Sequence, residues 1–547
     1  MIIRVVLTLF LTFVCFSRSG PAQQIPDFIR DMQLQAIETD AASWGYWGLD
    51  PSKYTGWVNH SNRLIPIYVY GGSLEPFKGA RSLYRDEERI RDVYSVVPEG
   101  TFNPKANYID QTDLYQLQVD AVKAGKKNII LLIFDGMDWQ TTQAAAIYKQ
   151  QRIVYHEGRG CGLSFIDYQG APTDYGFCVT SSLFGDAKPD VNRQQFKEFP
   201  LEIAGGYVAA LGGSTPWQTP ASPAYLIGTH PEIKHVVTDS ASSATSITCG
   251  VKTYNSAINV NFQGKQVEPI ARQLQRAGFG IGVVTSVPIS HATPACAYAN
   301  NLDRDDYQDL TRDMIGLPSI SHPQTPLTGV DVLIGGGWGE VKEDDRTLQG
   351  QNYVPGNKFF TAADHDAVNH LNGGKYVIAE RTASKKGCNV LRYAALNAAK
   401  RQLRLLGYFG QTGGHLPYRT ADGNYDPTRG QMYYDRYSPE AISENPTLAE
   451  MTEAALTVLE SKNDSKGIWL MVEAGDVDWA NHNNNLDDSI GAVFSGEEAF
   501  DVIVKWIEKN QCWDDTLLIV TADHGHYFNL VLPEALIRPR EESANKR

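Results

Sequence analysis

Five short segments of the chain carry side chains that could bind metal ions or attack phosphorus. In chain order they contain Asp135; Ser240; His291 and Thr293; Glu473, Asp478 and His482; and Asp523 and His524. Carboxylate oxygens and imidazole nitrogens are usual zinc ligands, whereas magnesium prefers oxygen ligands alone. Taken singly, each residue would more often be a solvated loop carboxylate, a surface histidine or a helix cap. As a set, they predict a metal centre beside a serine.

Ser240 is the candidate nucleophile. It lies in the sequence Asp239-Ser240-Ala241, which we expect where a strand turns into a helix of small residues. Free N–H groups at a helix N-terminus attract an anion such as phosphate. Because no GxSxG signature of a Ser-His-Asp triad surrounds this serine, a metal is expected to activate its hydroxyl. The alternative is that Ser240 is only a helix N-cap.

Apolar runs that precede most of these side chains are expected to be strands buried on both faces. The runs span residues 128–134, 280–287, 468–472 and 517–520. Helical patterns at 267–277 and 446–459 alternate with them, which implies a mostly parallel sheet covered on both sides. Functional residues gather at the carboxyl ends of such strands, so the five segments should meet at one edge of the sheet.

The expected fold class is α/β: a three-layer sandwich with a central, mostly parallel sheet flanked by helices. Residues 23–535 are predicted to form one catalytic domain. Two segments at 148–230 and 340–437 are richer in Gly, Pro, Tyr and Asn. They are predicted to be large insertions at the active-site edge, and residues 536–547 a polar tail.

The composition restricts the classes of function. The chain of 547 residues has a formal net charge of −14. The affinity of a nucleic-acid-binding protein rests on an excess of Lys and Arg, so the net charge argues against that class. An acidic protein that binds phosphate must reverse its field locally, and bound metal ions are the simplest way to do so.

The N-terminus has the features of a secretory signal peptide. Arg4 is followed by a short apolar run and then by small residues at Gly20 and Ala22, so residues 1–22 are predicted to be removed on export. The run is short for a bilayer span, although an uncleaved anchor is the alternative. No other segment is long and apolar enough to cross a membrane. We therefore expect a secreted or periplasmic protein.

Six cysteines remain without the signal peptide, and export permits disulfides. Cys161 and Cys178 are the nearest pair in the sequence and are the predicted bridge. None of the six lies in a CxxC motif, so a zinc site made of thiolates is not expected.

The five segments, in this order, resemble the alkaline phosphatase family from about Lys126 to His526. The resemblance implies hydrolysis of small phosphate monoesters through a phosphoserine, with two zinc ions and one magnesium ion. It assigns one zinc to Asp135, Asp523 and His524; the second zinc to Asp478 and His482; and magnesium to Asp135, Thr293 and Glu473. No nucleic acid or stable membrane span is implied, and a homodimer is compatible with the sequence.

Two further positions are carried over from the resemblance. His291 stands where some family members have Asp and others His; with His, the third site should bind magnesium less tightly or accept zinc. Arg304 matches the arginine that holds two phosphate oxygens, for which a planar guanidinium is suited. The alternative for Arg304 is an exposed arginine among acidic residues.

The sequence departs from the family at the second zinc. The family supplies a further histidine well downstream of the Asp-His pair, but no histidine follows His526. Either the chain is truncated, which we favour, or another residue completes the shell, with His526 and His415 as candidates. Asp478 and His482 alone would hold zinc weakly, and activity would then be low or absent.

Three functions therefore compete. The first is a phosphomonoesterase. The second is a phosphodiesterase or sulfatase-like relative with the same metal-binding core, although Ser240 lacks the C/S-x-P-x-R setting of a sulfatase. The third is a catalytically impaired phosphate- or metal-binding homologue.

Overall fold

The computed structural model describes residues 28–183, 188–198, 205–233, 236–427, 437–462 and 465–538. The predicted signal peptide at 1–22 and residues 539–547 of the predicted tail lie outside these residues. Leu536 is fully buried, so the packed body extends past the tail boundary that the sequence suggested. Within the described ranges, no helix combines the length and apolarity needed to cross a bilayer.

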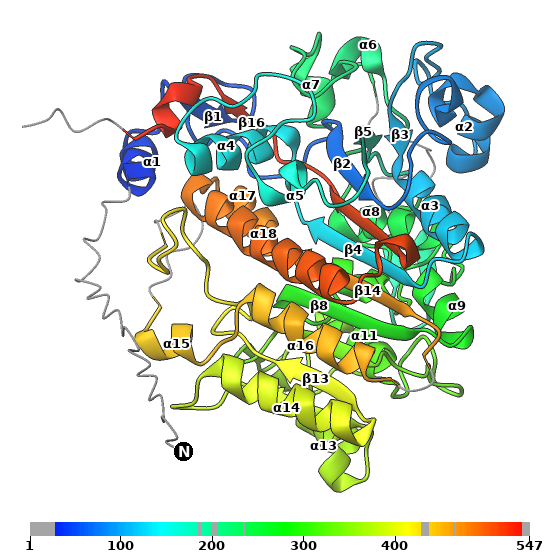
Figure 1. Ribbon diagram of the computed structural model, residues 1–547. Helices are drawn as coiled ribbons and strands as arrows, with labels where there is room; N and C mark the ends of the chain where they lie inside the picture. Colours follow the sequence, from blue (N-terminus) through cyan, green and yellow to red (C-terminus); the bar gives the residue numbers. More distant parts are fainter. Residues whose placement is uncertain are drawn as a thin grey trace, which may run out of the picture.

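A ten-stranded sheet forms the middle layer of the described chain (Figure 1). In spatial order its strands are β12 (Tyr376–Glu380), β13 (Arg404–Tyr408), β9 (Val332–Gly336), β8 (Gly280–Pro288), β14 (Ile468–Ala474), β4 (Asn128–Phe134), β15 (Thr516–Ala522), β2 (Ile65–Tyr70), β5 (Thr173–Val179) and β3 (Ile109–Asp110). Of these ten, only β2 runs against the others, because it pairs antiparallel with both β15 and β5. The sheet is mostly parallel, as predicted.

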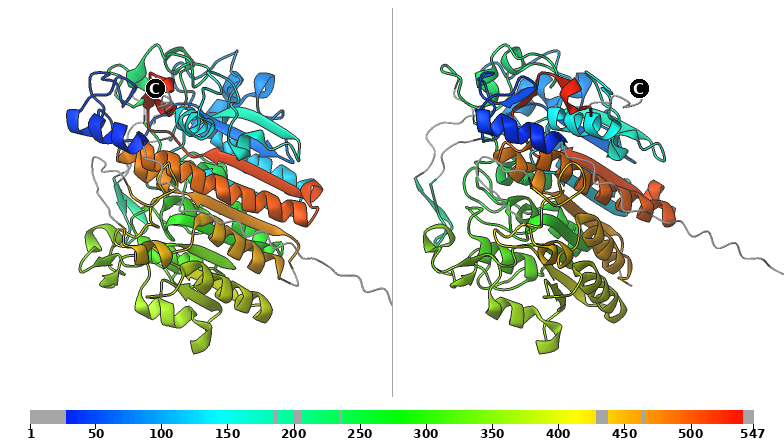
Figure 2. Two further views of the ribbon diagram at one scale, coloured as in Figure 1. Left: turned by 60° about the vertical axis from the view of Figure 1, so that its left-hand side comes forward. Right: turned by 90° about the vertical axis from the view of Figure 1, so that its left-hand side faces the viewer.

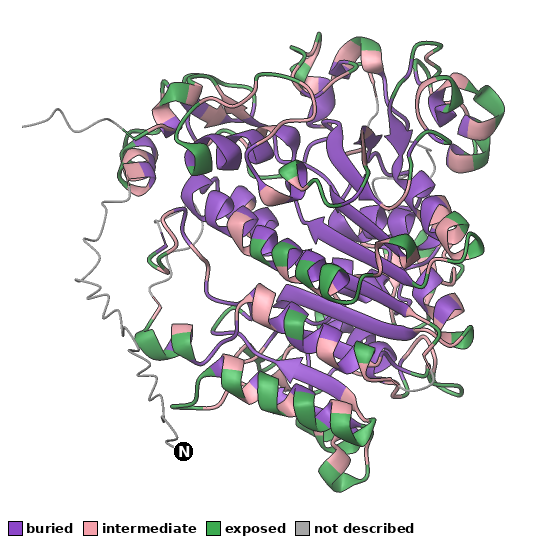
Figure 3. Cartoon of the chain, viewed as in Figure 1, coloured by how far each residue is buried: buried purple, intermediate pink, exposed green. Residues whose placement is uncertain are grey.

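The four predicted strands are confirmed. β4 has the predicted limits. β8 and β14 extend the predicted runs by one and two residues at the carboxyl end, and β15 extends its run by one residue at the start and two at the end. Every residue of these four strands is buried, because helices cover both faces of the sheet (Figure 3).

Helices pack on both faces, which completes the predicted three layers (Figures 1 and 2). One face carries α4 (Trp139–Gln150), α14 (Gly387–Arg401), α16 (Leu448–Glu460) and α18 (Leu486–Lys509). The other carries α3 (Gln111–Lys123), α8 (Ser240–Cys249), α9 (Ile270–Arg276), α10 (Ala292–Cys296) and α11 (Tyr307–Ile315). The helix predicted at 267–277 begins only at Ile270, because Pro269 occupies its N-cap.

Smaller elements occupy the connections. They are α1 (Phe28–Thr39), β1 (Gly45–Trp47), α2 (Glu87–Tyr94), α5 (Ser164–Asp167), β6 (Lys188–Asp190), β7 (Gln195–Glu198), α6 (Ala209–Gly212), α7 (Pro223–Leu226), β10 (Val341–Lys342), α12 (Arg346–Gln349), β11 (Gly356–Asn357), α13 (Ala362–Val368), α15 (Pro439–Ser443), α17 (Asp476–His482) and β16 (Phe528–Leu530).

The two segments predicted as insertions are not wholly insertions. β5 lies within 148–230, whereas β12, β13 and the covering helix α14 lie within 340–437. Their strands escaped prediction because they are short or only partly buried: β5 has four half-buried residues, and β12 ends on exposed Glu380. Both segments therefore help to build the sheet.

The predicted disulfide between Cys161 and Cys178 is wrong. All six described cysteines are free. Cys178 is fully buried in β5, whereas Cys161 lies in the loop after α4, where its Sγ donates to the carbonyl of Val154. Closeness in the sequence does not bring the two thiols together, because one lies within the sheet and the other outside it.

The N-terminal part of the chain packs beside its C-terminal part. β1 pairs antiparallel with β16, and α1 contacts α18. Arg538 lies over the ring of Phe28, and Figure 2 shows α1 near the last described residues. Segments before β2 therefore meet segments that follow β15.

Candidate active site

The structure brings the predicted site residues to the carboxyl-end edge of the sheet. By strand, they are Asp135 after β4; His291 and Thr293 after β8; Glu473 near the end of β14; and Asp523 and His524 after β15. Asp478 and His482 lie one turn apart on α17, which begins just beyond β14, with Oδ1 and Nε2 3.4 Å apart. Asp478 and His482 therefore lie on one face of a helix, as their spacing in the sequence predicts.

Ser240 is the first residue of α8. The N-cap is Asp239, whose side chain accepts a hydrogen bond from the N–H of Ser242 at 2.9 Å. Residues 236–239 are irregular, so the expected strand before this helix is absent. The Ser240 hydroxyl is buried, 3.2 Å from Nε2 of His524 and 3.4 Å from Oδ1 of Asp135.

A first candidate metal group contains Asp135, Asp478 and His524, whose ligand atoms lie within 4.8 Å of one another. Nε2 of His524 is 3.2 Å from Oδ1 of Asp135 and 3.6 Å from Oδ2 of Asp523. Oδ1 of Asp523 accepts the N–H groups of Gly136 and His524. Its Oδ2 has no hydrogen-bond partner among the described residues, so it is available as a ligand.

A second candidate group contains Asp135, His291 and Glu473. The hydroxyl of Thr285 donates to one carboxylate oxygen of Glu473. The other oxygen of Glu473, Oδ2 of Asp135 and the hydroxyl of Thr293 are buried and find no partner in the described ranges. Buried polar atoms are nearly always satisfied, so these oxygens fit a cation with oxygen ligands.

The electrostatics of the site also favour cations. Burial, reinforced by the charges of Asp523 and Asp478, raises the pKa of Asp135 well above its usual value. Burial likewise raises the pKa of Glu473 to about 8, and burial together with Arg304 lowers the pKa of His291 to about 3. The His291 imidazole is therefore already neutral, as a metal ligand must be, and bound cations would restore the ionised carboxylates.

A third candidate group contains His60, Asp478, His482 and His526. Nε2 of His526 is 2.7 Å from Oδ1 of Asp478, and Nε2 of His60 is 3.0 Å from Nε2 of His482. His526 was one candidate for completing this shell. The other, His415, stacks on the ring of Tyr418 and belongs to none of the three groups.

His60 was not identified from the sequence, although a signal was present. The run at 65–70 is apolar and strand-like, and His60 precedes it. The expectation that site residues follow parallel strands, which present their carboxyl ends to the site, does not extend to a residue that precedes a strand. β2 runs in the opposite direction, so its amino end faces the same edge.

Arg304 lies beside α8, the helix that begins at Ser240. Its Nη1 donates to Oδ2 of Asp239 at 3.0 Å, and its Nη2 lies 3.1 Å from Nε2 of His291. The arginine is therefore held between the N-cap of α8 and the second candidate group, where its guanidinium could bind an anion at Ser240.

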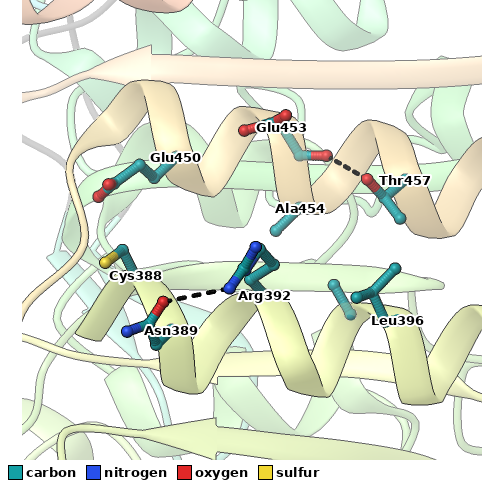
Figure 4. Close-up of a pocket in the computed structure, with 9 residues that line it drawn as sticks. Cys388, Asn389, Arg392, Leu396, Glu450, Glu453, Ala454 and Thr457 are labelled. Atoms are coloured by element: carbon teal, nitrogen blue, oxygen red, sulfur yellow. Dashed lines mark hydrogen bonds between the residues drawn. The ribbon is translucent and has the colours of Figure 1, made fainter. Parts of the chain in front are cut away.

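A groove of about 410 Å³ lies elsewhere, between α14 and α16 (Figure 4). Arg392 and Cys388 line it from α14, and Glu450 and Glu453 from α16. None of the residues in the three candidate metal groups lines this groove, so it is not part of the candidate active site.

Comparison with known proteins decides the family. The family model described as alkaline phosphatase matches residues 222–537. This chain belongs to the alkaline phosphatase family. The predicted family is thus confirmed, and the matched region contains Ser240 and Arg304 but not Asp135 or His60.

Individual alkaline phosphatases are similar over part of their length. Alkaline phosphatase 4 of Bacillus subtilis is 29% identical over 402 residues, which cover 72% of this chain and 66% of that protein. The Escherichia coli alkaline phosphatase is 32% identical over 313 residues, which cover 54% of this chain and 60% of that protein. The crystal structure of the Thermus thermophilus alkaline phosphatase is 22% identical in sequence, with a TM-score of 0.42. The match covers 73% of this chain and 60% of that chain. The chain spans about two thirds or less of the length of these curated alkaline phosphatases.

Proposed function

We propose that this protein hydrolyses phosphate monoesters through a phosphoserine intermediate at Ser240. The observation that carries the proposal is the buried Ser240 hydroxyl, 3.2 Å from His524 and 3.4 Å from Asp135, among groups of residues that fit metal ions. Membership of the alkaline phosphatase family supports the same reaction.

In this proposal the site holds two zinc ions and one magnesium ion. The first zinc would be held by Asp135, Asp523 and His524; the second by Asp478, His482 and a further imidazole; and magnesium by Asp135, Thr293 and Glu473, with His291 beside them. Bound there, such ions supply Lewis-acid chemistry that favours the deprotonated forms of serine and water.

The residues of the chain account for the remaining chemistry. The Ser240 oxygen forms a bond to phosphorus while the ester oxygen leaves and takes up a proton. Water then breaks the serine–phosphorus linkage, which releases phosphate and restores the hydroxyl. Arg304, fixed by Asp239, would bind two phosphate oxygens throughout, and the N-terminus of α8 adds positive potential.

The proposal also explains how an acidic protein can attract a phosphate dianion. The chain has a net charge of −14, and the site contributes four carboxylates: Asp135, Glu473, Asp478 and Asp523. Three divalent cations would supply six positive charges, so the site becomes net positive before Arg304 is counted.

The impaired-homologue hypothesis rested on an incomplete second zinc shell. His60 and His526 both lie beside Asp478 and His482, so two imidazoles are available to complete it. This arrangement favours an active phosphomonoesterase over a binding protein.

The test compares the hydrolysis of a chromogenic phosphate monoester and its diester counterpart by the purified protein with Zn²⁺ and Mg²⁺. We expect a faster metal-dependent rate on the monoester, lowered roughly a thousandfold or more in Ser240→Ala. Ser246→Ala is the matched control, because Ser246 lies in the same helix and donates to the carbonyl of Ser242. Full metal-dependent activity of Ser240→Ala would refute the nucleophile, and a preference for the diester would indicate a phosphodiesterase.

A further inference from the structure

We propose that His60, rather than His526, is the imidazole that completes the second zinc site. The ligand that the family supplies downstream would then come from the N-terminal part of this chain. The inference rests on the proposed function, because it concerns a ligand of the same metal centre.

The tautomers of His60 and His482 determine which ring nitrogen of each residue can bind a metal ion. Nδ1 of His60 lies 2.9 Å from the carbonyl oxygen of Thr238, and Nδ1 of His482 lies 2.7 Å from that of Val58. A carbonyl oxygen can only accept a hydrogen bond, so each ring carries its proton on Nδ1. Both Nε2 atoms of the neutral rings therefore present lone pairs.

The two lone pairs face each other. Nε2 of His60 is 3.0 Å from Nε2 of His482, and the two atoms are 3.5 and 3.4 Å from Oδ1 of Asp478. No proton is available between the two neutral rings, so their contact is repulsive as it stands. A cation bound by the two nitrogens and the carboxylate oxygen would turn this repulsion into coordination, with a donor set that zinc prefers.

His526 differs in the atom that faces the site. Its Nε2 lies 2.7 Å from Oδ1 of Asp478, a distance that requires an N–H donor opposite the carboxylate. A protonated Nε2 cannot bind metal. His526 therefore acts on the metal through Asp478, as a hydrogen-bonded partner that orients a ligand.

The fold fixes His60 in this position. The next residue, Ser61, forms an isolated antiparallel bridge with Gly525, and its N–H donates to the Gly525 carbonyl at 2.6 Å. The side chain of Asn62 donates to the carbonyl of Val236. Residues 60–63 are all buried, and the centroid of the His60 ring lies 3.8 Å from that of the His524 ring, with the two rings tilted by 30°. A metal ligand is expected to be held in place by its surroundings in this way, whereas a histidine on an exposed surface is not.

The strand order explains how an upstream residue can replace a downstream one. β2 lies next to β15 and runs against it, so the loop before β2 reaches the edge where β15 delivers His524. His60 lies outside residues 222–537, the region that matches the family model. The second zinc site is thus completed from a part of the chain that the family model does not cover.

Metal binding, measured without substrate, tests the assignment. Metal-free protein and its variants are dialysed against Zn²⁺, and bound zinc is counted by mass spectrometry. We expect His60→Gly to lose one of two tightly bound zinc ions, with affinity at that site lowered more than about a hundredfold. His526→Gln should retain both ions and weaken one by roughly 10- to 100-fold. His156→Ala, at an exposed histidine, should be unchanged.

Chemical rescue separates a ligand from a structural residue. Free imidazole should restore the lost zinc in His60→Gly and have no effect on His526→Gln. Loss of the ion in His526→Gln with retention in His60→Gly would overturn the assignment, as would failure of the rescue in a folded His60→Gly protein. If His60→Gly does not fold, NMR of wild-type protein with labelled histidine and NMR-active cadmium provides the test: coupling of cadmium to Nε2 of His60 supports it, and coupling to His526 instead overturns it.

This experiment distinguishes the two proposals. A wild-type protein that binds zinc through His60 but turns over no phosphate ester would contradict the proposed function and support the ligand assignment. Efficient hydrolysis of phosphate esters, together with zinc retained in His60→Gly, would support the proposed function and contradict the ligand assignment.

Discussion

The Ser240 hydroxyl lies 3.2 Å from Nε2 of His524, although 284 residues separate the two in the chain. The contact forms because α8 begins, and β15 ends, at the same edge of the sheet. Both side chains are buried, and Ser243 of α8 donates to the carbonyl of Asp523 at 2.8 Å. The proposed nucleophile and the candidate metal ligand are therefore held by α8 and by the segment that follows β15, which are hydrogen-bonded to each other.

Replacing Arg304 by Lys should weaken phosphate binding. A lysine ammonium is a point charge and cannot bind two phosphate oxygens with the planar geometry of a guanidinium. We expect KM for a monoester, and the inhibition constant of inorganic phosphate, to rise roughly tenfold or more. Steady-state kinetics with Arg276→Lys, an exposed control, provides the measurement. Unchanged phosphate inhibition would show that Arg304 does not contact the substrate.

Replacing Glu473 by Gln should weaken the magnesium site selectively. The substitution keeps the shape of the side chain but removes a charge from the oxygen ligands around Asp135. We expect Mg²⁺ affinity to fall by about 10- to 100-fold while both zinc ions stay bound. Isothermal titration of zinc-loaded protein with Mg²⁺ measures this change. If Mg²⁺ binds both proteins equally, Glu473 is not its ligand.

The parallel strands and their polar ends could be predicted because the apolar runs at 128–134 and 468–472 are long and wholly buried. The site residues that follow such runs were found by the same rule. Two features could not be predicted, for physical reasons. β12 is short and ends on an exposed residue, so its pattern is weak. The direction of β2 depends on its neighbours in the sheet and is not encoded by its own residues. His60 was missed because its position depends on that direction.

Lys252 should be a strong determinant of stability. Its Nζ lies 3.2 Å from Oδ2 of Asp110, and both side chains are fully buried. Lys252→Met would leave the Asp110 carboxylate buried without its cation, which typically costs about 3–5 kcal/mol. We expect a loss of this size in the free energy of unfolding by urea. The double variant Lys252→Met, Asp110→Asn should recover part of the loss, and a Lys252→Met protein as stable as wild type would contradict the prediction.

Asp113 should make the metal-free protein less stable as the pH rises. Burial raises the pKa of its carboxyl to about 7, from 3.8. Between these two values the unfolded chain loses the proton while the folded protein keeps it, so stability decreases through this window and levels off above it. Asp113→Asn should show a smaller decrease from pH 4 to pH 7 in urea unfolding. Equal decreases in both proteins would exclude this role for Asp113.

Anomalous diffraction at the zinc absorption edge, from crystals of the zinc-loaded protein, tests most directly whether Ser240 lies in a metal centre. We expect two zinc peaks, each about 2.0–2.2 Å from its ligands. One should contact His524 and Asp523, and the other Asp478 and His482. Zinc bound only elsewhere, or no zinc at these four residues, would contradict a metal-activated serine.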